Sequence, residues 1–158
     1  MNEPVALAEK LRAEGEKLVG FMAGLAEHEW RAEVYTEGTT WTVRSILAHL
    51  MTAERAFLKL FGQIRQGGGG LSEDFDIDRY NASQQTKTKE MSPRILMEEF
   101  QAARMNMVAF VQGLSSEELE KRGRHPFLGV TTLREMVKMI YIHNQTHYRD
   151  VRRVLKPQ

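Results

Sequence analysis

The sequence predicts an all-α protein folded as a four-helix bundle, and three observations lead to this prediction. Four long segments carry apolar residues at the three- and four-residue spacing of an amphipathic helix. No stretch of six or more residues alternates apolar and polar side chains as a strand would. Only four prolines occur, all near segment ends, so long helices are permitted between them.

The first helix is predicted from about Pro4 to Glu27. Proline suits the first turn of a helix, because the N–H that it lacks would have no partner there. One apolar stripe then follows at helical spacing, as a core-facing helix requires: Leu7, Leu11, Leu18, Met22 and Leu25.

The second helix is predicted from about Thr42 to Gln66. It ends at the four consecutive glycines Gly67–Gly70, because glycine is a poor helix former and a common helix terminator. Its apolar residues form a broad arc rather than a narrow stripe: Val43, Ile46, Leu47, Leu50, Phe57, Leu58 and Phe61.

The third and fourth helices each begin with a recognisable cap. Ser92–Pro93 places a capping serine before a proline at the first helical position, and Thr132–Glu135 has the spacing of a capping box. Ser115–Glu118 is a further capping box and predicts a short turn of helix between them. The apolar stripes contain Leu96, Phe100, Ala103, Met107, Phe110 and Leu114 in the third helix, and Leu133, Met136, Val137, Ile140, Val151 and Val154 in the fourth.

The connection from Gly67 to Met91 separates the second and third helices by about 25 residues, which is too long for a tight antiparallel hairpin. It predicts a long crossover that leaves these two helices parallel. A short extra helix is expected at Asp78–Asn81 within the crossover. We expect one domain that covers residues 1–158.

Composition excludes several kinds of chemistry. The chain has no cysteine, which rules out disulfides, Cys-ligated zinc, iron–sulfur centres and a thiol nucleophile. The formal net charge is +1, so nucleic acid is not expected as a partner, and the basic residues near the end of the fourth helix are expected to form a solvated face: Arg149, Arg152, Arg153 and Lys156. No apolar run is long enough to span a membrane, and the N-terminus lacks the pattern of a secretory signal, so a cytoplasmic location is expected.

Three of the five histidines fall where the helical pattern requires core residues. His143 and His147 are four residues apart, so their rings lie on one face of the fourth helix, close to the direction of Ile140. His49 lies about 10 Å along the second helix from Thr42, and His147 lies about 12 Å from Leu155. If these helices are antiparallel, the three imidazoles meet at one level of the bundle.

Such a convergence has two interpretations. A buried histidine is commonly just a hydrogen-bonded core residue, but three neutral imidazoles with an open fourth position are typical of a catalytic metal site. Zinc is the default metal for such ligands, and nickel, iron(II) and copper are also compatible. A zincin protease is disfavoured, because Asn144 stands where the HExxH motif requires a glutamate as general base.

Other polar residues are candidates for supporting or pocket roles. Glu54 lies inside the apolar arc of the second helix, where an arginine partner is the favoured explanation and water activation the alternative. Asp150 lies one turn beyond His147 and could accept a hydrogen bond from a metal ligand. Asn144 falls on the buried stripe of the fourth helix and needs a partner. Tyr80, in the crossover, is a candidate pocket residue.

Three segments together resemble the DinB/YfiT-like superfamily of metalloenzymes. Trp41–Leu50 is similar to the family's opening of the second helix, His125–Leu133 to its entry into the fourth helix, and Ile142–His147 to its closing HxxxH. The likeness covers nearly the whole chain in order and spacing. It implies a bundle of up-down-down-up order, frequent homodimers, and a metal, usually nickel or zinc, held by His49, His143 and His147.

The resemblance and the residues leave three functions open. The protein could be a metal-dependent enzyme that hydrolyses a small-molecule substrate. It could instead transfer a low-molecular-weight thiol supplied from outside, as family members that use mycothiol or bacillithiol do, and this role would require basic groups in the pocket. The third possibility is a non-enzymatic metal- or ligand-binding stress protein, which predicts a filled coordination sphere and no cleft above the metal.

Overall fold

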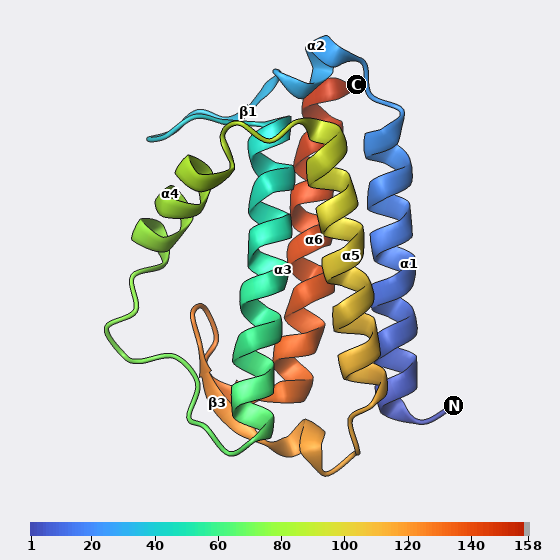
Figure 1. Ribbon diagram of the computed structural model, residues 1–158, viewed down its shortest axis with the longest axis vertical. Helices are drawn as coiled ribbons and strands as arrows, with labels where there is room; N and C mark the ends of the chain where they lie inside the picture. The colour runs from blue at the N-terminus through green and yellow to red at the C-terminus, as the bar shows by residue number, and fades with distance from the viewer. Residues whose placement is uncertain (157–158) are drawn as a thin grey trace.

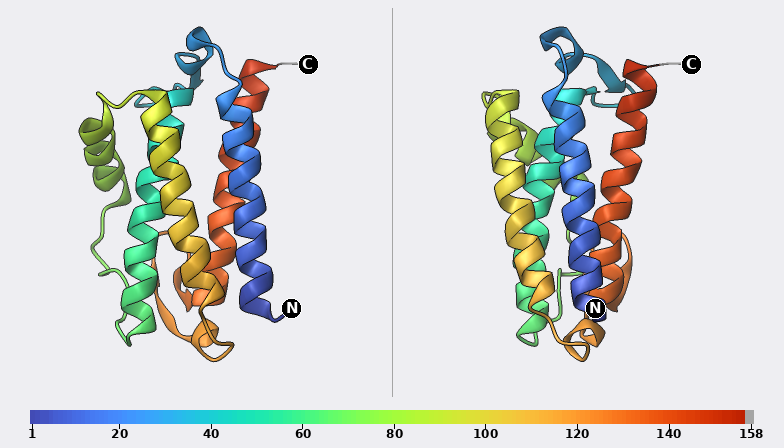
Figure 2. Two further views of the ribbon diagram at one scale, coloured as in Figure 1. Left: turned by 45° about the vertical axis from the view of Figure 1, so that its right-hand side comes forward. Right: turned by 90° about the vertical axis from the view of Figure 1, so that its right-hand side faces the viewer.

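The computed structural model describes residues 1–156. Four long helices pack side by side (Figure 1): α1 (Glu3–Ala23), α3 (Val43–Arg65), α5 (Pro93–Gln112) and α6 (Leu133–Leu155). The two further views in Figure 2 show the same four helices with their long axes roughly aligned. The helical bundle predicted from apolar spacing is therefore confirmed.

The chain direction can be followed in Figure 1, where the N-terminus lies at the lower end of α1. The chain rises along α1, descends along α3, descends again along α5 and rises along α6 to the C-terminus. The connection between α3 and α5 runs up the outside of the bundle and contains α4 (Ile77–Thr88). Long connections of this kind allow neighbouring helices to run in the same direction.

Side-chain caps explain where three of the long helices begin. The hydroxyl of Thr42 accepts a hydrogen bond from the backbone N–H of Ser45 at 3.1 Å, and Ser92 and Thr132 cap α5 and α6 in the same way. Each cap satisfies one of the backbone N–H groups that the first turn of a helix leaves unpaired. Among residues 1–156, no helix has the length and hydropathy that crossing a membrane requires.

The first helix ends earlier than its apolar stripe predicts. Helix α1 stops at Ala23 with Gly24 as its cap, and a separate short helix, α2 (Glu27–Trp30), follows. The stripe continued to Leu25 because that side chain still packs on the core. The predicted turn near Ser115 is the 3₁₀ helix η1 (Glu118–Glu120).

The expectation that strands are absent was wrong. Two antiparallel hairpins are present: β1 (Glu33–Tyr35) pairs with β2 (Trp41–Thr42), and β3 (Arg122–His125) pairs with β4 (Gly129–Thr132). Their strands span two to four residues, which is too short to show the alternation that identifies strands in a sequence. Each hairpin leads directly into a long helix at one end of the bundle (Figure 1).

The crossover is fixed to the second hairpin by a close backbone contact. Leu71 donates its backbone N–H to the carbonyl of Arg124 at 3.0 Å, and Arg124 donates to the carbonyl of Gly69 at 2.9 Å. Gly70 lies between them with φ +88°, and a Cβ there would come within 2.2 Å of the Arg124 nitrogen. Only glycine fits this position, so the start of the crossover is held in one place.

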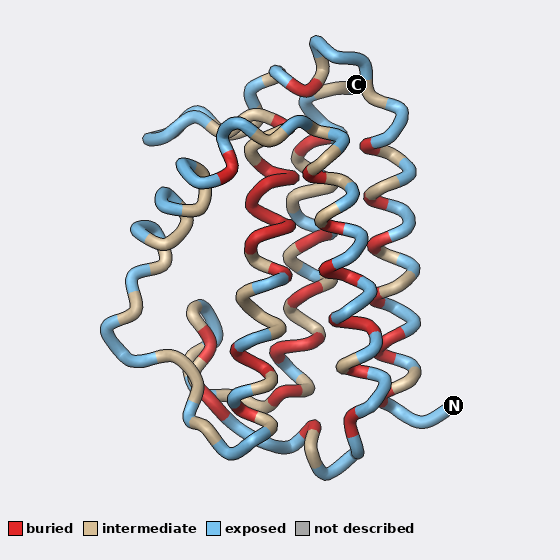
Figure 3. The backbone as a smooth tube through the Cα atoms, viewed as in Figure 1, coloured by how far each residue is buried: buried red, intermediate tan, exposed pale blue. Residues whose placement is uncertain are grey.

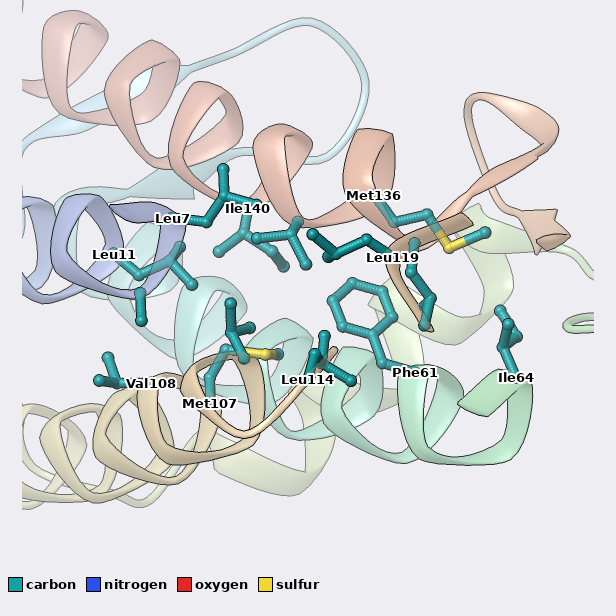
Figure 4. Packing of buried hydrophobic residues seen from close by; sticks show 14 of the residues in the cluster. Leu7, Leu11, Phe61, Ile64, Met107, Val108, Leu114, Leu119, Met136 and Ile140 are labelled. Carbon is teal, nitrogen blue, oxygen red and sulfur yellow. The ribbon is translucent and has the colours of Figure 1, made fainter. Parts of the chain in front are cut away.

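Buried residues face the inside of the bundle along its whole length (Figure 3). They form two apolar clusters, one at each end. In the cluster that contains Leu7 and Met136, the ring of Phe61 points into the space between Leu114, Leu119 and Met136 (Figure 4). The other cluster contains Leu18, Ile46, Leu50, Phe100 and Val151, among others. The buried polar residues include His49, Glu54, Arg104 and Asn144.

Candidate metal centre

Three histidine side chains meet inside the bundle. Nε2 of His143 lies 3.0 Å from Nε2 of His49 and 3.0 Å from Nε2 of His147. One ligand atom from each of the three residues lies within 4.8 Å of the others, a spacing that a single metal ion could bridge. The predicted convergence of three imidazoles is therefore present.

The helices place these rings by simple geometry. His143 and His147 are one turn apart on α6, and His49 stands on the neighbouring helix α3. Their directions and depths follow from the fixed rotation and rise of an α-helix, which is why their meeting could be anticipated.

Burial keeps the three rings neutral. It lowers the pKa of His143 to about 4. Burial and the neighbouring His143 lower the pKa of His147 to about 4, against a smaller opposing effect of Asp150. Burial and the two other histidines lower the pKa of His49 well below its ordinary value. Neutral imidazole is the form that binds a metal ion, so the centre is ready for a cation at physiological pH.

A carboxylate and a phenol support His147 from behind. The hydroxyl of Tyr35 donates a hydrogen bond to Oδ2 of Asp150 at 2.6 Å and lies 2.9 Å from Nδ1 of His147. Burial raises the pKa of Asp150, but hydrogen bonds from Tyr35 and Arg149 outweigh this effect and leave the pKa lowered. Burial and the bond to Asp150 raise the pKa of Tyr35, so the phenol keeps its proton.

These contacts fix the tautomer of His147. An ionised carboxylate can only accept hydrogen bonds, so the single hydroxyl proton of Tyr35 is directed to Asp150. The phenol oxygen must then accept the proton of Nδ1 of His147. A neutral imidazole carries one N–H, which leaves the Nε2 lone pair of His147 directed toward the other two rings.

The donor set fits a cation better than it fits hydrogen bonding among the rings. One proton on Nε2 of His143 can satisfy only one of its two 3.0 Å contacts. The other contact then lacks its own hydrogen bond, and if Nε2 of His143 carries no proton, its lone pair faces the lone pair of His147. A cation that accepts all three lone pairs removes this conflict, and three imidazoles are suitable ligands for nickel or zinc.

A small apolar cavity of about 110 Å³ adjoins the centre. His49 and His143 line it, and the lining includes no lysine, arginine, aspartate or glutamate among the described residues. Tyr80, the candidate pocket residue predicted from the sequence, lines this cavity. The other lining residues come from α3, the crossover and the β3–β4 turn: Ala53, Ala56, Phe57, Leu60, Leu71, Phe75, Ile77, Asn81, Pro126 and Phe127.

Two neighbouring hollows share lining residues with this cavity. A wide one, about 780 Å³, lies between the first hairpin and α4 and is lined by Tyr35, Trp41 and Asn81, among others. A second, about 250 Å³, is lined by Arg124 and His125 and shares Leu71, Phe75, Pro126 and Phe127 with the apolar cavity. The centre is thus approached from the α4 side.

Glu54 and Asn144 do not contribute to the centre. Arg104 of α5 donates to Oε1 of Glu54 at 3.1 Å, to the side-chain oxygen of Asn144, and to the carbonyl of Leu11 at 2.8 Å. All three polar side chains of this network are buried. The arginine partner expected for Glu54 is therefore Arg104. Asn144 accepts a hydrogen bond from the same arginine and does not contact a histidine of the centre through a hydrogen bond.

The sequence did not reveal Tyr35 or Trp41 as parts of the site. The Trp41 ring lies 4.9 Å from the ring of His49, and Tyr35 contacts His147 on the adjacent helix α6. Both stand on the β1–β2 hairpin. Its strands carry no readable pattern, and its position over α6 depends on tertiary packing alone. Asp150 was expected beside His147, and it acts through Tyr35.

Three solved structures share this fold at low sequence identity. YfiT from Bacillus subtilis, described as "a probable metal-dependent hydrolase with an unusual four-helix bundle topology", is 16% identical, with a TM-score of 0.73 over 96% of this chain and 83% of its own. An uncharacterised protein from Escherichia coli UTI89 is 14% identical, with a TM-score of 0.75 over 97% and 91%.

The third structure corrects the expectation about partners. The colibactin self-resistance protein ClbS, solved in complex with double-stranded DNA, is 14% identical, with a TM-score of 0.76 over 96% of this chain and 94% of its own. The expectation that nucleic acid is excluded was wrong, because a protein with this fold is found bound to a DNA duplex. Net charge is a property of the whole chain and does not report on a local surface.

Sequence comparison assigns the family. No curated protein matches the chain. The family model of the DinB superfamily matches residues 10–151, which include all three histidines of the centre. The chain belongs to the DinB superfamily.

Proposed function

We propose that the protein is a metal-dependent hydrolase that acts on a small, largely apolar and uncharged substrate. His49, His143 and His147 would hold the cation, with nickel or zinc as the expected metal. The observation that carries the proposal is the meeting of three Nε2 atoms beside a cavity that two of the same histidines line. The description of YfiT as a probable metal-dependent hydrolase supports it.

The chemistry divides between the cation and the chain. A divalent cation bound by three imidazoles lowers the pKa of a water molecule and polarises a substrate oxygen. The chain holds the ligands neutral and fixes the His147 tautomer through Tyr35 and Asp150. Its apolar wall, which includes Phe57 and Phe127, excludes bulk water and selects an apolar substrate.

Hydrolysis fits the cavity better than thiol transfer does. Low-molecular-weight thiols such as mycothiol and bacillithiol are polar, and a site for them needs cationic or polar groups. No basic side chain among the described residues lines the cavity beside the histidines. The basic side chain of Arg124 lines the neighbouring hollow instead and pairs with Glu73 at 3.2 Å.

An enzyme also fits better than a protein that only stores or senses metal. A storage or sensing site predicts a filled coordination sphere and no cleft above the metal. Here three protein ligands face one another and a cavity begins at two of them. An open position next to a substrate-sized space is typical of catalytic centres.

The metal content of the purified protein tests this proposal. Nickel and zinc would be measured in the wild type and in the variants His49→Ala, His143→Ala and His147→Ala, with His28→Ala on α2 as the matched control. We expect each of the three variants to lose metal and hydrolysis of small apolar esters, and His28→Ala to keep both. Equal metal content in all four variants would reject the proposal.

A second candidate function is binding of duplex DNA. It is favoured by an exposed hollow at the end of α6 whose lining is entirely basic: Arg149, Arg152, Arg153 and Lys156. The complex of ClbS with double-stranded DNA supports it. Clustered cations bind phosphates without reading sequence, so the affinity should fall steeply with salt.

Fluorescence anisotropy with a labelled duplex tests this candidate. Replacing Arg152, Arg153 and Lys156 by glutamine should weaken binding. The slope of log affinity against log salt concentration should become less steep by about one for each phosphate that the variant no longer neutralises. Arg94→Gln, at an exposed position paired with Glu98, is the control. Binding that is insensitive to salt or to the triple change would exclude this surface.

A further inference from the structure

His125 is a buried histidine that the metal centre does not use. It ends strand β3 and is only 2% exposed. Its ring stacks on Phe57, with ring centroids 5.1 Å apart and an angle of 7° between the planes. Phe57 itself lines the apolar cavity beside His49 and His143.

The hydrogen bonds of His125 fix its tautomer. Its Nδ1 accepts the backbone N–H groups of Phe127 at 3.1 Å and Leu128 at 3.2 Å. Backbone amides can only donate, so Nδ1 must present a lone pair. Burial, with a smaller contribution from His143, lowers the pKa of His125 to about 4. The ring is neutral at physiological pH, and its single proton is on Nε2.

This Nε2–H has no acceptor. Among the residues that the structure describes, it is the one buried side-chain nitrogen or oxygen without a hydrogen-bond partner. Buried polar groups in folded proteins nearly always have partners, so this group is expected to meet an ordered water or a ligand oxygen.

The ring lines a hollow that adjoins the apolar cavity. His125 lines the 250 Å³ hollow, together with Ser72 and Arg124. Leu71 and Phe127 line both this hollow and the apolar cavity next to the histidine centre. A molecule with its apolar part against Phe127 in the cavity could therefore extend into the hollow that His125 lines.

The backbone around His125 is well supported. The preceding residue, Arg124, is fixed to the crossover through Gly69 and Leu71. The β3–β4 turn closes on the His125 ring through its two backbone N–H groups. A donor held in this way loses little conformational entropy when it binds a ligand.

We propose that Nε2–H of His125 donates a hydrogen bond to a carbonyl oxygen of a small organic ligand that extends from the apolar cavity into the hollow that His125 lines. The ligand class is thus an apolar body that carries an oxygen acceptor. For its role in turnover this inference rests on the proposed function, but binding through His125 does not require a metal.

NMR of metal-free protein with ¹⁵N-labelled histidine tests the proposal. Benzamide supplies an uncharged acceptor oxygen on a small ring, and toluene is the matched probe without one. We expect the free protein to show the Nε2–H tautomer at His125. Benzamide should shift the Nε2 signal and bind roughly tenfold more tightly than toluene, the ratio expected for one hydrogen bond.

Two variants separate the donor from the cavity. His125→Leu should lose the preference for benzamide over toluene and keep its nickel affinity. Ala53→Leu, which fills the cavity, should weaken the binding of both probes. A proton on Nδ1 of wild-type His125, or no shift of Nε2 with benzamide, would overturn the proposal even if His125→Leu fails to fold. Loss of the metal site alone would leave this result unchanged, so the two proposals can fail separately.

Discussion

The hydroxyl of Tyr35 lies 2.9 Å from Nδ1 of His147, although 112 positions separate the two residues in the sequence. The same hydroxyl donates to Asp150, one turn further along α6. A carboxylate thus acts on a proposed metal ligand through a phenol instead of by direct contact. Groups that hydrogen-bond to a ligating histidine fix the ring orientation and raise its basicity, which links the first hairpin to the chemistry of the centre.

Replacing this hydroxyl should weaken metal binding and leave the fold intact. In Tyr35→Phe the ring still fills its place, but Nδ1 of His147 loses its acceptor and Asp150 loses a donor. We expect the affinity for nickel or zinc, measured by isothermal titration calorimetry, to fall about 10- to 100-fold. Tyr148→Phe, at a ring packed on Phe21, is the control. An unchanged affinity in Tyr35→Phe would show that the relay does not influence the ligand.

Replacing one partner of the buried ion pair between Glu54 and Arg104 should destabilise the fold strongly, whereas replacing both partners should destabilise it much less. Arg104→Met leaves the carboxylate of Glu54 buried without a cation, and we expect a loss of about 3–5 kcal/mol in the free energy of unfolding. The double variant Glu54→Met with Arg104→Met should recover most of this loss, because neither charge then remains in the core. Urea unfolding measures both. Losses that simply add would contradict this account.

Local rules account for the parts of the fold that the sequence predicts. The caps at Thr42, Ser92 and Thr132 act within three residues of themselves, so their effect is readable without tertiary contacts. His49 and His147 meet because rigid helices have a fixed rise and rotation. Predicting that meeting required only the relative direction of α3 and α6.

Contacts that depend on tertiary packing could not be predicted. Tyr35 belongs to a three-residue strand, and nothing in its neighbourhood marks it as a partner of His147. An arginine partner was expected for Glu54, but choosing Arg104 requires the rotation of α5 about its axis. The burial of His125 follows from the way the second hairpin packs on Phe57, which no local pattern reveals.

Acid should destabilise the metal-free protein in a defined pH interval. His143 and His147 have pKa values lowered from 6.5 to about 4. The unfolded chain therefore takes up protons below pH 6.5 while the folded state stays neutral, and stability falls as the pH drops from about 6.5 to about 4. We expect a loss on the order of a few kcal/mol. Urea unfolding at pH 7, 5.5 and 4.5 checks it.

Variants assign this acid sensitivity to the centre. The double variant His143→Gln with His147→Gln removes these two of the titrating rings, so its free energy of unfolding should change less over the same interval. Carboxylates elsewhere titrate equally in both proteins and cancel in the comparison. An identical pH dependence in the two proteins would show that the lowered pKa values do not contribute to stability.

The contact between the crossover and the second hairpin should control the shape of the cavity. Gly70→Ala places a Cβ 2.2 Å from the backbone nitrogen of Arg124 at a φ of +88°, so we expect unfolding to become easier by at least about 2 kcal/mol. Gly69→Ala meets open space and should change stability by less than about 0.5 kcal/mol. This neighbouring pair forms a matched comparison.

The same substitution should affect ligand binding more than metal binding. Leu71 and Phe75, which line the cavity, follow Gly70 in the chain, whereas the three histidines stand on α3 and α6. Gly70→Ala should therefore weaken the binding of benzamide and retain the nickel affinity, provided that both are measured below the unfolding temperature. A parallel loss of both would mean that the bundle, and not the crossover alone, depends on this glycine.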